Sequence, residues 1–176
     1  MEKRIILIGV ILAAAASRIL PHPPNIAPIA GIALFAGANL GFLPGLIISL
    51  SAMLLSDAVI GFHGTMLYVY GSFILIILLG RLLQNKQTPG RLFGMSLFSS
   101  ILFFIITNFG VWAEGQLYAK NITGLQTVYV MGLPFLRNTM IGDMFYTFAI
   151  FYGYLGVVYI VKRFNYLLLG FKPLSR

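Results

Sequence analysis

The chain has 176 residues, of which 59% are hydrophobic and only 9% are charged. A soluble domain carries about 25% charged residues, so most of this chain is expected to lie in lipid. The absence of cysteine excludes disulfides, thiolate metal sites and cysteine nucleophiles. The formal net charge of +8 is typical of basic loops that orient a membrane protein. No basic stretch is interleaved with stacking aromatics, so no nucleic-acid partner is predicted.

Long apolar stretches separated by short polar ones run along the whole chain. A membrane-spanning helix needs about 20 predominantly apolar residues. The sequence predicts one all-α transmembrane domain, residues 1–176, with six spans at approximately 5–20, 28–42, 44–60, 66–83, 92–109 and 134–161. Proline starts and stops helices, and the prolines that fall at or between the predicted span ends are Pro21, Pro23, Pro24, Pro28, Pro44, Pro89 and Pro134.

The basic residues fall mainly on one side of this arrangement. Cytoplasmic loops of membrane proteins are enriched in Lys and Arg. With both termini in the cytoplasm, the inner face carries Lys3, Arg4, Arg81, Lys86, Arg91, Lys162, Arg163, Lys172 and Arg176. The outer face then carries only Arg18, Lys120 and Arg137. An alternative is that the basic start and the apolar run up to Ser17 form a cleaved signal peptide, which would leave five spans.

Unusual polar residues gather at the three predicted outer loops, 18–27, 61–65 and 110–133. Both histidines, the single tryptophan and two of the acids lie at or near this face. The candidate ligand contacts there are Arg18, His22, Asn25, Asp57, His63, Asn108, Trp112, Glu114 and Arg137. For Asp57, an interfacial acid or a hydrogen bond at the helix end is the alternative. The outer aromatic residues, which form either a membrane-interface belt or a stacking wall for a flat ligand, are Phe62, Phe109, Trp112, Tyr118 and Tyr129.

Asp143 is predicted to lie deep inside the last span, where a carboxylate is costly and commonly marks function. Three interpretations are open for it: a ligand contact, a structural pair with Arg18 or Arg137, or a proton relay. Polar residues at helical spacing accompany it and predict one cavity lined by two stripes. The stripes are Thr139, Asp143 and Thr147 on the last span, and Ser96, Ser100 and Thr107 on the fifth.

Small residues recur every four positions on the first two spans. Gly9, Ala13 and Ser17 share one face of the first span, and Ala33, Gly37 and Gly41 share one face of the second. Such spacing lets helix backbones approach closely. The face on the first span serves either packing within the bundle or docking of another membrane protein.

Neither a metal site nor a catalytic motif is predicted. His22 and His63 with Asp57 and Glu114 offer metal-ligating atoms, but no histidine pair has ligand spacing and no HExxH motif is present. The chain also lacks GxSxG, Walker and SxxK motifs. No cofactor and no catalytic residue are therefore assigned.

Several short motifs together resemble an uncharacterised family of small bacterial membrane proteins, catalogued as a domain of unknown function. They are Arg18–Asn25 (RILPHPPN), Leu34–Gly37 (LFAG), Leu55–Asp57 (LSD), Ile60–His63 (IGFH), Asn108–Trp112 (NFGVW), Gly124–Leu125 (GL) and Gly142–Asp143 (GD). In organisation the chain resembles the substrate-binding S components of energy-coupling factor (ECF) vitamin transporters. That resemblance implies an extracytoplasmic substrate site built from the loops after the first, third and fifth spans. It also implies that Gly9, Ala13 and Ser17 dock a transmembrane coupling protein, with ATP hydrolysed by partner ATPases.

The first functional hypothesis is a substrate-binding subunit for uptake of a small, vitamin-like organic molecule, integral to the bacterial cytoplasmic membrane. A second is an intramembrane enzyme on a lipid-like substrate, with His22, Asp57 and Glu114 as acid–base groups. A third is a structural or assembly protein whose working surface is its small-residue grooves.

Overall fold

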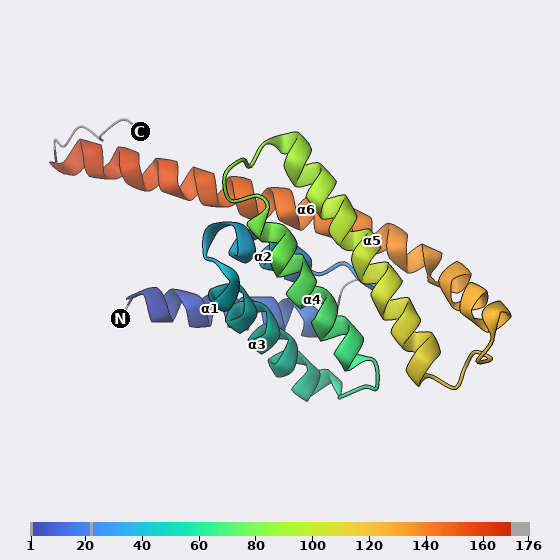
Figure 1. The fold of residues 1–176 in the computed structure, drawn as a ribbon. Coiled ribbons are helices and arrows are strands. Elements are labelled where there is room, and N and C mark those ends of the chain that lie inside the picture. The colour runs from blue at the N-terminus through green and yellow to red at the C-terminus, as the bar shows by residue number, and fades with distance from the viewer. Residues whose placement is uncertain (1, 22, 170–176) are drawn as a thin grey trace.

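The computed structural model describes residues 2–21 and 23–169, with side chains described between residues 8 and 164 apart from residue 22. The prediction of an all-α chain is confirmed within this part. The helices are α1 (Glu2–Ile19), α2 (Ile29–Asn39), α3 (Phe42–Ile60), α4 (Met66–Arg81), α5 (Pro89–Glu114) and α6 (Ile122–Leu169), shown in Figure 1.

Three of the described helices, α3, α5 and α6, are long and apolar enough to cross a membrane, with mean hydropathies of 1.9, 1.9 and 1.7. Helices α2 and α4 are shorter apolar helices, and so is the part of α1 from Ile8 to Ile19. Many large apolar side chains lie on the outside of the bundle, Leu67, Phe145 and Ile160 among them. An apolar exterior of this kind suits lipid and would be unfavourable in water.

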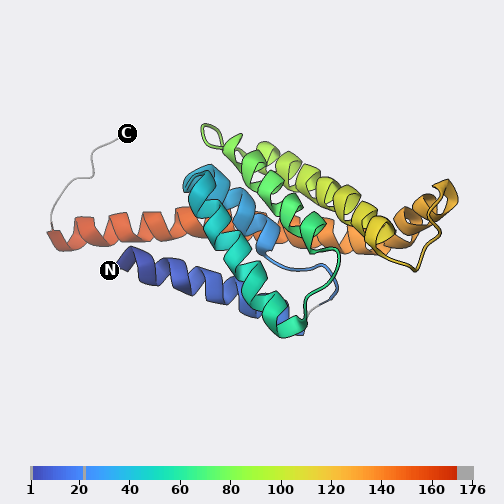
Figure 2. The same ribbon diagram turned by 60° about the horizontal axis from the view of Figure 1, so that its bottom comes forward.

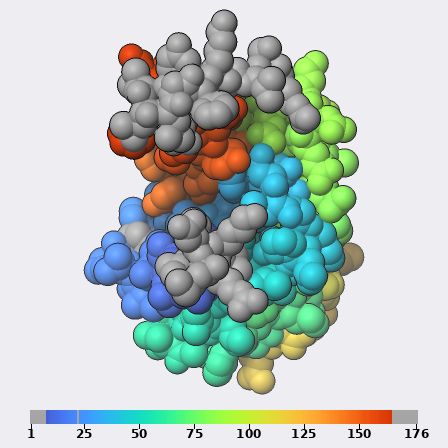
Figure 3. Space-filling model, turned by 90° about the vertical axis from the view of Figure 1, so that its left-hand side faces the viewer, coloured from blue at the N-terminus to red at the C-terminus, as the bar shows by residue number. Residues whose placement is uncertain are grey.

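The short helix α2 lies at the centre of the bundle. It packs against α3, α4, α5 and α6, while α1 packs against α3. Helices α5 and α6 run antiparallel and side by side in both ribbon views (Figures 1 and 2). The beginning of α1 and the end of α6 lie at the same end of the molecule, the end that Figure 3 faces.

Glycines bring α2 and α4 into backbone contact. A Cβ on Gly37 would overlap the carbonyl oxygen of Ile77, and a Cβ on Gly80 would overlap that of Leu34. The close approach predicted for Gly37 is therefore confirmed. Gly41 has a different role, because it precedes α3 with a φ of 99° and has open space around it. A left-handed φ of this kind is readily adopted by glycine alone.

The third predicted outer loop is wrong at both ends. Helix α5 continues through Glu114 and α6 already begins at Ile122, so the connection is far shorter than 110–133. Pro134 consequently lies inside α6 and does not start a helix. Proline is tolerated within membrane helices, because neighbouring groups can satisfy the carbonyl that loses its donor. The other helix ends also shift: α2 stops at Asn39 and α6 continues to Leu169.

Candidate functional site

An ion pair joins α1 to α3 at the end of the bundle away from the start of α1. Arg18 Nη1 lies 2.7 Å from Asp57 Oδ1, and the Asp57 side chain is 1% exposed. The hydroxyl of Tyr70 on α4 donates to Asp57 Oδ2 at 2.8 Å. Arg18 also donates to the hydroxyl of Ser56 and, at 3.3 Å, to the carbonyl of Met53. Both Asp57 oxygens are thus engaged, and the Asp57 side chain joins three helices.

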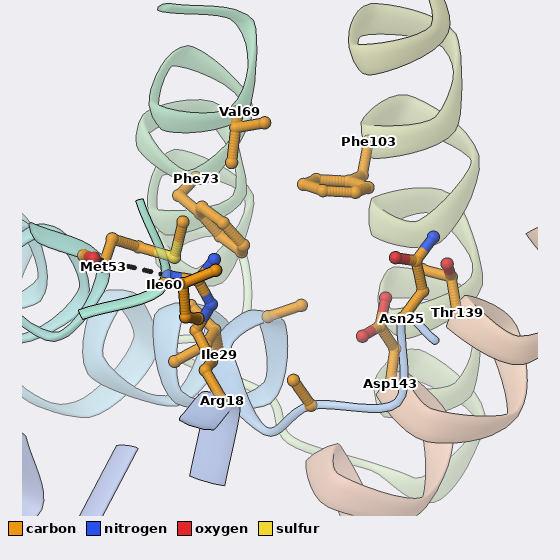
Figure 4. Close-up of a pocket in the computed structure, with 12 residues that line it drawn as sticks. Arg18, Asn25, Ile29, Met53, Ile60, Val69, Phe73, Phe103, Thr139 and Asp143 are labelled. Atoms are coloured by element: carbon orange, nitrogen blue, oxygen red, sulfur yellow. Dashed lines mark hydrogen bonds between the residues drawn. The ribbon is translucent and has the colours of Figure 1, made fainter. Parts of the chain in front are cut away.

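Beside this ion pair lies a cavity of about 190 Å³ to which all six helices contribute (Figure 4). Its polar lining is Arg18, Asn25, Thr139 and Asp143, and its apolar lining is Ala27, Ile29, Ala30, Met53, Ile60, Val69, Phe73 and Phe103. In Figure 4 Asn25, Thr139 and Asp143 gather on one side, and Arg18 and Ile29 lie across from them. Small-molecule sites commonly combine an apolar wall with a few placed polar groups.

Asp143 lies where α5 and α6 pack against each other, and it is 3% exposed. Ser100 on α5 donates its hydroxyl to Asp143 Oδ2 at 2.7 Å. Thr139, one turn earlier on α6, also lines the cavity and donates to the carbonyl of Phe135 at 2.8 Å. The two predicted polar stripes therefore meet at Ser100 and Asp143. Arg18 is paired with Asp57 and does not neutralise Asp143.

Arg18, Asn25 and Asp143 are the predicted ligand contacts that the cavity brings together. Asn25 belongs to the loop between α1 and α2 and has a φ of 63°. Asparagine enters this left-handed region more readily than most residues, because its short amide can bond locally. The backbone at Asn25 thus forms a turn whose side chain reaches the cavity.

The other described contact candidates lie elsewhere, and His22 lies outside the described residues. His63 is exposed, with its Nδ1 atom 2.8 Å from the Thr65 hydroxyl. Arg137 is exposed on α6. Asn108 donates its amide to the carbonyl of Phe104 at 2.8 Å. None of these three side chains lines the described cavity, and their role as ligand contacts stays a prediction.

Trp112 and Glu114 belong to a separate cluster at the end of α5. Trp112 Nε1 donates to the carbonyl of Ala119 at 2.9 Å, and Lys120 lies over the indole ring, 5.6 Å from its centroid. Glu114 Oε1 accepts a hydrogen bond from Tyr68 at 3.1 Å. The contacts of Trp112 hold the connection between α5 and α6, whereas that of Glu114 joins α5 to α4. Asp57 and Glu114 thus have different hydrogen-bond partners, and their role as acid–base groups stays a prediction.

Sequence reasoning missed Tyr70, the hydrogen-bond partner of Asp57, and several residues that line the cavity. Tyr70 was detectable in principle, because a phenol in an apolar helix needs a partner for its hydroxyl. Nothing in the sequence separates Phe73 and Phe103 from the many other aromatic residues of the chain. Their position follows from how α4 and α5 pack, which apolar periodicity alone does not specify.

Gly9 and Ala13 lie on an exposed face of α1. A Cβ built on Gly9 would meet no atom within 4 Å. Ser17 is half-buried and donates its hydroxyl to the carbonyl of Ala14 at 2.6 Å. The buried side of α1 is instead formed by Ala14 and Ala15. Within the described residues, the face of α1 that carries Gly9 and Ala13 therefore takes no part in packing the bundle.

The long apolar helices, together with a cavity among them that carries a few polar side chains, define an α-helical membrane protein. Within that class, the chain belongs to a family of unknown function, DUF6580, whose model matches residues 1–166. No curated protein and no solved structure matches the chain.

Proposed function

We propose that this protein is the substrate-binding membrane subunit of an uptake system for a small, vitamin-like organic molecule. In this proposal all six helices span the bacterial cytoplasmic membrane, both termini are cytoplasmic, and the organisation is that of an ECF S component. The observation that carries the proposal is the cavity lined by Arg18, Asn25 and Asp143.

The chemistry of the cavity suits an organic ligand with polar groups at its ends. Phe73 and Phe103 supply apolar surface, while Asn25, Thr139 and Asp143 offer hydrogen-bonding atoms on one side (Figure 4). A bundle built only for structural support has no need of a buried acid beside an open cavity, because such an acid is costly in lipid.

The position of the cavity supports an extracytoplasmic site. It lies beside Arg18, in the last turn of α1, and beside the loop that follows. The beginning of α1 and the end of α6 lie together at the other end of the molecule (Figures 1 and 2). The basic residues at both chain ends favour the cytoplasm for that end.

The energy for uptake would come from partner proteins. The exposed small-residue face at Gly9 and Ala13 suits close approach of a helix from a transmembrane coupling protein. Partner ATPases would then drive release of the ligand into the cell.

The test is to purify the full chain in mild detergent and to identify co-purifying small molecules by native mass spectrometry. A panel of vitamins and precursors is screened in parallel by thermal shift. Asp143→Ala and Phe103→Ala are expected to lose bound ligand, whereas Trp112→Ala, outside the cavity, keeps it. If no ligand co-purifies and no compound shifts the unfolding temperature, the proposal fails.

A role in membrane assembly is the second candidate, and the exposed face of Gly9 and Ala13 is the observation that favours it. The two roles differ in what Gly9→Leu does. For an assembly protein this variant abolishes function, and cavity variants have no effect. For a substrate-binding subunit both kinds of variant abolish uptake, but only the cavity variants abolish ligand binding.

A further inference from the structure

Between α5 and α6 lies a buried acid that has no positively charged partner among the described residues. Asp143 is 3% exposed, and the described group that donates to it is the hydroxyl of Ser100. The one ion pair among the described residues joins Arg18 to Asp57, so it does not balance Asp143. A carboxylate in apolar surroundings needs either a cation or a proton.

Buried hydroxyl groups without hydrogen bonds also occur on the same two helices. Ser96 and Ser99 on α5 and Thr147 on α6 are fully buried, and their hydroxyl oxygens have no partner within the described chain. Serine and threonine in helices commonly donate to a carbonyl one turn earlier, and Ser72 and Thr139 do so here. Leaving a buried hydroxyl unpaired is unfavourable. Several unpaired hydroxyls on the helices that hold Asp143 therefore suggest that a ligand binds there.

The helix register places two of these hydroxyls next to the acid. Helices α5 and α6 run antiparallel (Figure 1). Ser100 contacts Asp143 directly. Ser96 precedes Ser100 by one turn, and Thr147 follows Asp143 by one turn. Ser96 and Thr147 therefore share one level of the helix contact, about 6 Å along the axis from Asp143 at 1.5 Å per residue. That level lies on the side of Asp143 away from Thr139 and the cavity.

Helix α2 closes this region from a third side. A Cβ on Gly31 would lie 3.0 Å from the backbone nitrogen of Thr147 and 3.1 Å from the carbonyl carbon of Tyr146. The backbone of α2 thus packs directly on α6 at this level. Close packing of this kind favours a small ligand over a large one.

We propose that the Asp143 carboxylate and the hydroxyl oxygens of Ser96, Ser100 and Thr147 bind one sodium ion between α5 and α6, on the side of Asp143 away from the cavity. Hydroxyl and carboxylate oxygens are ligands that suit hard cations. A single carboxylate balances one positive charge, so a monovalent ion leaves the site neutral. The close packing of α2 favours Na⁺ over the larger K⁺.

The sodium ion would reach this site through the cavity, because Asp143 borders both (Figure 4). Its binding would neutralise the one unbalanced charge in the cavity lining. The proposal concerns the inorganic ion alone, and it can fail while an organic ligand still binds, or succeed while none does.

The experiment measures the unfolding temperature of the full chain in detergent, in NaCl and in the chlorides of potassium and N-methyl-D-glucamine at equal ionic strength. Saturating Na⁺ is expected to raise the unfolding temperature by about 5 °C. Binding of radioactive sodium by scintillation proximity gives the stoichiometry, with one ion per chain expected.

Variants locate the ion. Asp143→Asn is expected to abolish the sodium-dependent shift. Thr147→Val keeps the side-chain shape without the oxygen and should weaken sodium binding at least about tenfold, a loss of about 1.4 kcal/mol. Ser49→Ala is the matched control, because Ser49 is also fully buried and unpartnered in the described chain but belongs to α3. This control should respond to sodium as the unmodified protein does.

Three results would overturn the proposal. The first is an equal response to Na⁺ and N-methyl-D-glucamine. The second is a sodium response that survives both Asp143→Asn and Thr147→Val. The third is an unfolding temperature that, in protein with Asp143 intact, depends on pH but not on sodium. Asp143 would then take up a proton in place of the ion. A variant that does not fold is recognised by its unfolding curve without sodium. Binding of radioactive sodium to the other of the two variants, Asp143→Asn or Thr147→Val, then tests the proposal.

Discussion

Arg18 and Asp57 form an ion pair of 2.7 Å that ties the last turn of α1 to the last turn of α3. Tyr70 adds α4 by donating to the second Asp57 oxygen at 2.8 Å. The pair lies at the edge of the cavity, because Arg18 is one of its lining residues. The geometry of Arg18 in the cavity therefore depends on Asp57, which does not line the cavity itself.

Removing the acid of this pair should destabilise the fold strongly. Asp57→Ala leaves the Arg18 guanidinium without its counter-ion, and breaking a buried pair costs about 3 kcal/mol or more. Thermal unfolding in detergent measures the loss. Glu114→Ala is the control, because Glu114 is exposed and accepts a single hydrogen bond. If both variants unfold at the same temperature, the ion pair does not hold the helices together.

The hydroxyl of Tyr70 should contribute independently of its ring. Tyr70→Phe keeps the aromatic packing and removes the hydrogen bond to Asp57, a loss of about 1.5 kcal/mol for a bond to a charged group. In the Asp57→Ala background the same change should have almost no effect. A double-mutant cycle of unfolding free energies measures this coupling, and additive effects would contradict the observed contact.

Adding even one methyl group at the contact between α2 and α4 should destabilise the fold. Gly80→Ala places a Cβ against the carbonyl of Leu34, so either the helices separate or the backbone shifts, at a cost of about 2 kcal/mol. Gly71→Ala on the same helix is the matched control, because a Cβ there meets no atom within 4 Å. That control should be neutral or slightly stabilising, since alanine favours helix over glycine. Equal unfolding temperatures for the two variants would argue against the close approach.

The sequence was informative about helices and polar stripes and much less so about which side chains meet. Asp143 and Ser100 were found because a polar residue in a membrane helix is conspicuous at any spacing. The sequence does not identify the partner of Arg18, since Asp57 and Asp143 carry the same carboxylate group and only the packing of α1 on α3 selects between them. At the end of α5 and the start of α6 the sequence predicts a loop, because Gly110, Glu114 and Pro134 suggest breaks. Contacts with neighbouring helices override these local signals.

The proposed topology can be tested with single cysteines, because the natural chain has none. Gly64→Cys and Gln116→Cys lie in the connections after α3 and α5, and Asn85→Cys lies in the connection after α4. All three positions are exposed. If all six helices span the membrane with both termini inside, the first two cysteines react with an impermeant maleimide in intact spheroplasts, and the third reacts only after lysis. The cysteine-free protein gives the background. Labelling of Asn85→Cys in intact spheroplasts, or protection of Gln116→Cys there, would contradict the six-span arrangement and with it an outward-facing cavity, because α5 alone separates those two positions.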